Sequence, residues 1–311
     1  MHKSLERIWV SFLDSPRFRQ FANQKVGMAI FRSQAYRSIL MQYNYVSSYY
    51  QSLTNPSAFK DVKTFGLFIG HNKSGTSLIG SLLDAHPNVI LADEVNALAY
   101  VSAGFKRDQI YHILLKGSRR ELMKGRVTAR RLKPYSYLVP GQWQGHYSTL
   151  QVIGDSTSGS STQRFAREPD LLQRLEKSMA GVDVKFIQVI RNPFDPISAM
   201  MIRGKRSFEN ATDHYFANAE TLVDLRKQIS RSNLLPVRYE DFINGSGNDL
   251  AKICQFLGIE ADDDYLKACK SILYKHPEKS RQMVNWEEKW VRIVEDKIGQ
   301  YDFLQGYSFN E

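Results

Sequence analysis

The most restrictive feature of this sequence is segment 64–87, TFGLFIGHNKSGTSLIGSLLDAHP. An apolar run comes first, then a loop of small residues, then a helical pattern that begins in that loop. A strand, a loop and the first turn of a helix in this order direct backbone N–H groups at one point, where they bind an anion. The segment therefore predicts a phosphate-binding loop. Its characteristic residues are Gly70, Lys73, Gly75, Thr76 and Ser77.

The loop differs from the triphosphate-binding pattern GxxxxGK[ST] at a decisive position. Gly75 is followed by Thr76, where that pattern has lysine, and the lysine of this loop, Lys73, precedes the second glycine. In nucleoside triphosphatases the missing lysine contacts the terminal phosphates next to Mg²⁺. This loop therefore favours a shorter phosphate chain.

A second candidate phosphate site follows another apolar run, in VKFIQVIRNPFDPISAMMIRG. The run 184–190 ends at Arg191, and Ser198 follows seven residues later. Arginine offers a planar fork that is always charged and suits a phosphate, and a serine hydroxyl can donate to the same oxygens. Pro193 fits a strand exit or a first helical turn, so we expect a short, rigid loop.

Together these two motifs resemble the sulfotransferases that use 3'-phosphoadenosine 5'-phosphosulfate (PAPS). The 5'-phosphosulfate loop of that family has the form [KR]-x-G-T-[ST]-x-[LI], and Arg191 with Ser198 resembles its 3'-phosphate motif. The resemblance implies transfer of a sulfuryl group from PAPS to a hydroxyl, with 3'-phosphoadenosine 5'-phosphate (PAP) as product and no required metal. The matching loop residues are Lys73, Ser74, Gly75, Thr76 and Ser77.

The same resemblance assigns three further donor contacts. Tyr239, in a YED segment, would lie against the adenine, although a tyrosine here could equally pack locally. Arg281, before the last helical pattern, would clamp the 3'-phosphate, with Lys279 a weaker candidate. Arg203 would also contact a phosphate, and exposure on a helix explains it equally well.

The catalytic base is assigned through the tyrosylprotein branch of the family. There LDAHP is followed by two acidic residues, and the second is the base, which corresponds to Glu94. Lys73 would stabilise the leaving phosphate. His71 is the alternative base, because histidine titrates near neutral pH. One departure concerns Ser156, which follows Gly-Asp where family members often carry a lysine.

The chain as a whole alternates between strand and helix after residue 60. We expect an α/β domain over 61–311, with a central parallel sheet flanked by helices in a P-loop-like three-layer sandwich and ligands at the carboxyl ends of the strands. Residues 1–60 predict a helical, aromatic N-terminal extension packed on that core. The expected strands are 65–69, 89–91, 151–153, 184–190 and 234–237.

Composition restricts the partners without selecting one. A net charge of +10 predicts anionic partners, and the basic stretch 106–133 suits a solvated helical face better than a docking patch. Two cysteines are too few for a disulfide framework or for a zinc site without a histidine cluster. No apolar stretch approaches the ~20 residues that span a bilayer, and no signal pattern begins the chain, so we expect a cytoplasmic protein.

Two other functions compete with sulfuryl transfer. The first is a nucleotide-dependent kinase. Against it, this sequence lacks the lysine that such a kinase carries in its phosphate loop, and only Asp155 lies near the place of a Mg²⁺ ligand. A noncatalytic binder of acidic polymers does not explain why both motifs follow strands. The acceptor stays open among a sugar, a small alcohol, a lipid headgroup and a peptide. No nucleic acid is expected as partner, and the aromatic extension predicts a homodimer or a peripheral membrane contact.

Overall fold

The computed structural model of this 311-residue chain describes residues 33–127, 135–245, 248–273 and 276–311. The residues group into two units, Met1–Thr54 and Asn55–Glu311. In the first unit one helix is described, α4 (Gln34–Thr54), which ends directly before Asn55 and Pro56. The predictions for residues 1–32 lie outside the described residues. Helix α4 contains no acidic residue and exposes an apolar stripe at alternating spacings of four and three residues: Ile39, Tyr43, Val46, Tyr50 and Leu53.

The second unit contains one five-stranded sheet in the order β2-β3-β1-β4-β5, and every pairing in it is parallel. Each predicted strand overlaps an observed one, which confirms the predicted α/β fold with a central parallel sheet. The strands are β1 (Thr64–Gly70), β2 (Val89–Ala92), β3 (Val152–Asp155), β4 (Asp183–Ile190) and β5 (Leu234–Arg238).

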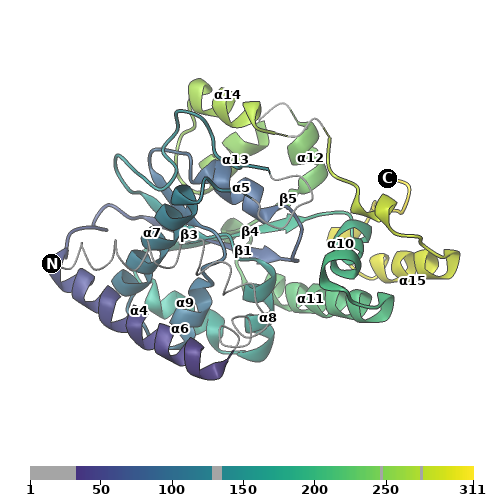
Figure 1. Cartoon of the computed structure of the whole chain (residues 1–311), viewed down its shortest axis with the longest axis horizontal. Coiled ribbons are helices and arrows are strands. Elements are labelled where there is room, and N and C mark those ends of the chain that lie inside the picture. The colour runs from purple at the N-terminus through teal and green to yellow at the C-terminus, as the bar shows by residue number, and fades with distance from the viewer. Residues whose placement is uncertain (1–32, 128–134, 246–247, 274–275) are drawn as a thin grey trace, which may run out of the picture. The chain divides into compact units, whose positions relative to one another are not determined.

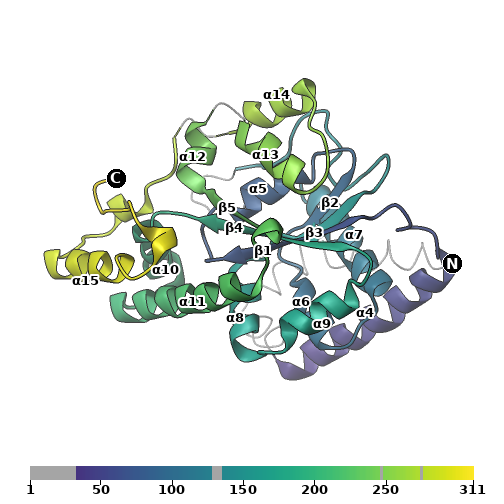
Figure 2. The same ribbon diagram turned by 180° about the vertical axis from the view of Figure 1, so that it is seen from behind.

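Helices cover both faces of this sheet. Figure 1 and the reverse view in Figure 2 place α5, α12, α13 and α14 on one side and α6, α8, α9 and α11 on the other. Among the described helices, none combines the length and apolar character needed to cross a bilayer. The helices are α5 (Thr76–Leu83), α6 (Ala97–Ser102), α7 (Arg107–Met123), α8 (Gly159–Arg167), α9 (Leu171–Ser178), α10 (Phe194–Gly204), α11 (Phe208–Gln228), α12 (Tyr239–Asn244), α13 (Asn248–Phe256), α14 (Asp263–Ser271) and α15 (Glu288–Ile298), with short 3₁₀ helices at Arg231–Asn233, Ser280–Met283 and Asp302–Leu304.

The strands are apolar because helices cover both faces of the sheet. All seven residues of β1 are buried. Phe65 packs with Tyr111 of α7, whereas Phe68 belongs to a core cluster that includes Leu82 of α5 and Ile253 of α13. Odd and even positions of a strand point to opposite faces, so a strand covered on both sides becomes a continuous apolar run instead of an alternating one.

The strand order creates one place at the carboxyl edge of the sheet where a ligand can bind. From β1 the chain first builds β2 and β3 on one side and then β4 and β5 on the other. Loops that leave β1 and β4 therefore diverge, and open α/β sheets bind ligands in such a crevice. Gly70 at the end of β1 pairs with Val189 of β4. The fold thus brings the loop after β1 and Arg191 after β4 to the same place.

Candidate functional site

The loop between β1 and α5 holds an unusual backbone. Lys73 has a φ of 70° and Gly75 a φ of 96°, both in the left-handed region. Glycine adopts this region readily, whereas a lysine there is strained and must be held by its surroundings. Thr76 then begins α5, whose first N–H groups have no partner within the helix and carry its partial positive charge. The loop therefore presents donors suited to an anion.

Gly75 is required for a second reason, because Tyr239 lies against it. A Cβ added at Gly75 would be 2.1 Å from Cε2 and 2.3 Å from Cδ2 of the Tyr239 ring. Tyr239 begins α12, directly after β5, and is buried. Two strand ends that lie far apart in sequence thus meet at this loop.

Helix α8 supports the loop from the other side. The Thr162 hydroxyl donates to the Gly70 carbonyl at 3.0 Å, and the Gly70 N–H donates to the same hydroxyl at 2.9 Å. Ser158 donates to the His71 carbonyl at 3.2 Å. These contacts give the hydroxyl-rich run 156–162 a role in fixing the backbone of the phosphate loop.

Arg191 joins the two sequence motifs directly. Its Nη1 donates to the Lys73 carbonyl oxygen at 3.0 Å, and its Nη2 donates to the Glu278 carbonyl. The guanidinium carbon lies 4.8 Å from the centre of the Tyr239 ring, within cation–π range. Lys73, Arg191 and Tyr239 therefore share one site at the carboxyl edge of the sheet.

The other candidate phosphate contacts gather around Asp195 of α10. Its carboxylate accepts from the Arg281 backbone N–H at 3.0 Å and from Arg281 Nη1 at 2.9 Å, and it lies 3.7 Å from Arg191 Nε. Ser198, one turn further along α10, accepts a hydrogen bond from Trp286 Nε1 at 3.1 Å. The buried carboxylate thus holds two arginines beside the Ser198 hydroxyl.

Arg203 lies on the same helix, near its end. Its Nη2 is 3.6 Å from a carboxylate oxygen of Glu278, the residue whose carbonyl accepts from Arg191. The segment that precedes Arg281 is therefore tied to α10 by Arg203 and to the loop before α10 by Arg191. The arginines expected to bind the 3'-phosphate therefore contact either Glu278 of this segment or Asp195 of α10.

The acid pair follows β2, and its two members differ sharply. Asp93 accepts hydrogen bonds from the Ser77 hydroxyl at 3.2 Å and from the Ser156 hydroxyl at 2.8 Å. Burial raises the pKa of the Asp93 carboxyl, and the neighbouring Glu94 charge adds to that effect. Glu94 is exposed and has a φ of 55°, another strained left-handed residue. Asp93 thus contacts Ser77 of the phosphate loop, and Glu94 is the next residue in the chain.

His71, the alternative base, has a structural environment. Its ring is buried, stacks on Tyr215 with centroids 3.7 Å apart, and places Nε2 3.0 Å from the Tyr215 carbonyl. Burial lowers the pKa of His71 to about 3. An imidazole with that pKa is neutral and a weak base at neutral pH, so the environment disfavours His71 as the proton acceptor.

Asp155, the nearest candidate for a Mg²⁺ ligand, is also committed to the fold. Its carboxylate accepts from the backbone N–H of Ala97 at 2.6 Å and from both the N–H and the hydroxyl of Thr157, at 3.1 and 2.8 Å. The side chain is fully buried. It attaches the start of α6 to the end of β3, which removes the residue on which the kinase alternative depended.

Three contributions were not predicted from the sequence. Ser156 follows Gly-Asp where a lysine was expected, and its hydroxyl contacts Asp93 instead of the donor loop. Asp195 and Trp286 hold Arg281 and Ser198 in place. Asp195 lies inside the second motif, four residues after Arg191, and that helical spacing was the available signal.

A family model described as the sulfotransferase family matches residues 67–263. A search of curated proteins returned no match. Among solved structures, the sulfotransferase domain of the Synechococcus PCC 7002 olefin synthase is 15% identical, with 78% of this chain and 96% of that chain covered and a TM-score of 0.48.

Two further solved structures show the same level of similarity. A sulfotransferase from Alicyclobacillus acidocaldarius is 16% identical, with 79% of this chain and 96% of that chain covered and a TM-score of 0.44. A mouse sulfotransferase complexed with PAP is 13% identical, with 76% and 84% covered and a TM-score of 0.41. The family match covers more than half of the chain, and this protein belongs to the sulfotransferase family.

Proposed function

We propose that the protein transfers a sulfuryl group from PAPS to a hydroxyl acceptor. The observation that carries this proposal is the 3.0 Å contact between Arg191 Nη1 and the Lys73 carbonyl. It brings a 5'-phosphate loop and a 3'-phosphate arginine to one site, as a nucleotide with phosphate groups at both ends of its ribose requires. The PAP complex of the mouse relative supports the choice of donor.

The residues at this site suit such a donor. The Ser74 hydroxyl, in the phosphate loop, is buried and has no hydrogen-bond partner among the described residues. Buried polar groups are rarely left without a partner, so this hydroxyl is consistent with an anion that completes it. Residues 73–77 would bind the phosphosulfate, Tyr239 the adenine, and Arg191, Ser198, Arg203 and Arg281 the 3'-phosphate.

The chemistry assigned to the protein is an in-line displacement at sulfur. The acceptor oxygen forms the new S–O bond, the bond between sulfur and the 5'-phosphate oxygen breaks, and PAP leaves with that electron pair. The Glu94 carboxylate takes the proton of the acceptor hydroxyl. Lys73 stabilises the negative charge that grows on the leaving phosphate. The base assignment rests on the likeness of the acid pair to the tyrosylprotein branch and on the exposure of Glu94.

Ligand-induced stabilisation tests the donor assignment. A ligand that binds only the folded state raises the melting temperature, so PAP should raise it in the presence of EDTA, while ATP should do so poorly. Arg191→Ala should remove most of the PAP effect. If ATP with Mg²⁺ stabilises the protein and PAP does not, the donor assignment is wrong and a kinase becomes the better interpretation.

The acceptor is the part of this function that the donor site leaves open. Sugars, small alcohols, lipid headgroups and peptides remain the proposed classes, and incubation of labelled donor with a metabolite extract would identify the labelled product. The exposed apolar stripe of α4 supports the expected contact with a second copy or with a membrane surface.

A further inference from the structure

Residues 135–151, which lead into β3, are anchored by buried polar groups. The Asp84 carboxylate, at the end of α5, accepts from the Gly145 N–H at 2.9 Å and from the Ser118 hydroxyl. The Gln144 amide donates to the carbonyls of Ser81 and Tyr137, both at 2.8 Å. Side chains next to residues 144 and 145 are therefore presented from a fixed backbone.

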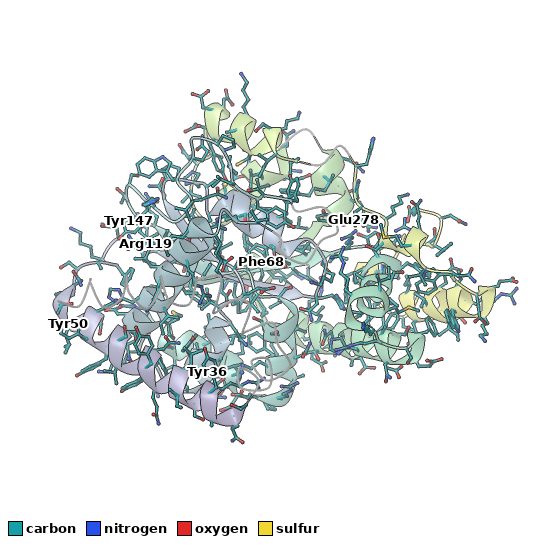
Figure 3. The ribbon with its side chains drawn as sticks, viewed as in Figure 1. Tyr36, Tyr50, Phe68, Arg119, Tyr147 and Glu278 are labelled. Atoms are coloured by element: carbon teal, nitrogen blue, oxygen red, sulfur yellow. The ribbon has the colours of Figure 1, made fainter. Side chains whose placement is uncertain are left out.

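On the outer side of this anchored segment lies a cavity of about 450 Å³. Arg119 of α7 lines it, and its Nε donates to the Gly145 carbonyl at 3.4 Å, which ties the arginine to the segment. Figure 3 labels Arg119 and Tyr147 close together on this part of the unit. Trp143 is 42% exposed, an unusual position for a large aromatic side chain on an anchored loop. The remaining lining residues are Gly141, Gln142 and His146.

This cavity is separate from the donor site. Gly117 faces the sheet, because a Cβ added there would be 2.4 Å from Val95 and 3.5 Å from Ala92. Arg119 is two residues further along α7, about 200° around the helix. It therefore points away from the acid pair, and none of the residues assigned to the donor lines the cavity.

We propose that this cavity binds an acidic saccharide through a carboxylate-bearing sugar ring. Arg119 offers the planar fork that matches a carboxylate. Trp143 and Tyr147 offer aromatic faces for the apolar face of the ring, while Gln142 and His146 offer polar groups for its hydroxyls. The net charge of +10 would attract such a ligand.

Other ligand classes fit the lining less well. A purely apolar molecule would offer no hydrogen bond to Arg119, Gln142 or His146. A nucleic-acid strand needs a basic groove that follows its phosphates, whereas among the described residues a single arginine lines this cavity. The proposal gives part of the basic stretch 106–133 a ligand, where the sequence favoured a solvated face.

The test compares two disaccharides without any donor present, so it does not depend on sulfuryl transfer. Titration calorimetry would measure binding of glucuronosyl-glucose and of its neutral counterpart, glucosyl-glucose. The acidic disaccharide should bind at least ~10-fold more tightly, because a charge-assisted hydrogen bond contributes about that much. Arg119→Ala should abolish the difference, and Arg119→Lys should restore only part of it.

Matched variants control for charge and exposure. Arg120→Ala removes the adjacent exposed arginine, which does not line the cavity, and should leave binding unchanged. Trp143→Ala should weaken both disaccharides, whereas Leu138→Ala, a residue 40% exposed on the same segment, should not. All four positions are exposed, so melting temperatures should change little.

Three results would overturn the proposal. The first is equal binding of the acidic and neutral disaccharides, or no binding of either at millimolar concentration. The second is an equal loss in Arg119→Ala and Arg120→Ala, which would indicate general charge attraction. The third is tighter binding of a short single-stranded oligonucleotide with the same dependence on Arg119 and Trp143. PAP-induced stabilisation should be retained in every variant if the donor site is separate.

Discussion

At the scale of single residues, both proposed catalytic groups, Lys73 and Glu94, have a strained backbone. Lys73, Glu94 and Asn96 are non-glycine residues with positive φ, and all three lie in the segments that follow β1 and β2. Such a backbone is costly and persists where the surroundings enforce it, which is common at functional sites. The sequence indicated Lys73 and Glu94 through motifs, but it could not indicate their backbone, because non-local contacts impose that conformation.

The strained and exposed Glu94 gives a direct test of proton transfer. Glu94→Gln keeps the shape of the side chain and removes its ability to accept a proton. We expect kcat to fall ~10²-fold or more, the usual contribution of a positioned base. The Kd for PAP should stay the same, because the assigned donor contacts do not include this side chain. Steady-state kinetics and calorimetric titration would measure the two quantities.

Glu176→Gln is a suitable control for this substitution. Glu176 is exposed on α9 and belongs to none of the assigned groups, so both kcat and PAP binding should be retained. Normal turnover by Glu94→Gln would contradict the base assignment. The partly buried neighbour Asp93, which contacts Ser77 and Ser156, would then be the next candidate.

At the scale of elements, the sequence predicted the strands and helices whose formation depends on neighbouring residues in the chain. Apolar runs such as 184–190 predicted strands because both sheet faces are covered, and the small-residue loop 70–77 predicted the start of α5. The contact of Tyr239 with Gly75 was not predictable, since it joins α12 to a loop more than 160 positions away in sequence. The same holds for Asp195 and Arg281, whose pairing depends on how the chain returns to α10.

The packing of α12 on the phosphate loop makes Gly75→Ala a sensitive substitution. The new Cβ would lie 2.1 Å from the Tyr239 ring, and the residue would keep a φ near 96°. We expect a loss of about 2–4 kcal/mol in unfolding free energy, from left-handed strain and overpacking together. PAP affinity should fall at least ~10-fold as the loop and Tyr239 move apart. Urea denaturation and titration with PAP would measure these effects.

Gly181→Ala separates the two causes. Gly181 also has a positive φ, 82°, but a Cβ there meets nothing within 4 Å. This variant should lose only the strain contribution, about 1–2 kcal/mol, and should bind PAP normally. Equal stability losses in the two variants, with PAP binding intact in both, would show that Tyr239 does not constrain the loop.

At the scale of the whole molecule, burial of acidic groups should affect how stability depends on pH. Burial raises the pKa of Asp155 from its ordinary value near 3.8 to about 6, and the nearby Asp93 charge adds to this increase. Hydrogen bonds from Ala97 and Thr157 oppose the increase without cancelling it. The sequence indicated Asp155 only as a metal-ligand candidate, because its enclosure depends on α6 and β3 packing together.

The sign of the effect follows from proton binding. Between pH 4 and 6 the folded protein holds a proton on Asp155 that the unfolded chain releases, so this carboxyl stabilises the fold at low pH and loses that contribution as the pH rises through about 6. The difference between the pKa values corresponds to at most about 3 kcal/mol. The unfolding free energy of the wild type minus that of Asp155→Asn should therefore decrease from pH 4 to 6 and level off above pH 7. Urea denaturation at half-unit pH intervals would measure it. A difference that stays constant or increases over that range would mean that Asp155 is ionised in the folded protein and that its hydrogen bonds outweigh its burial.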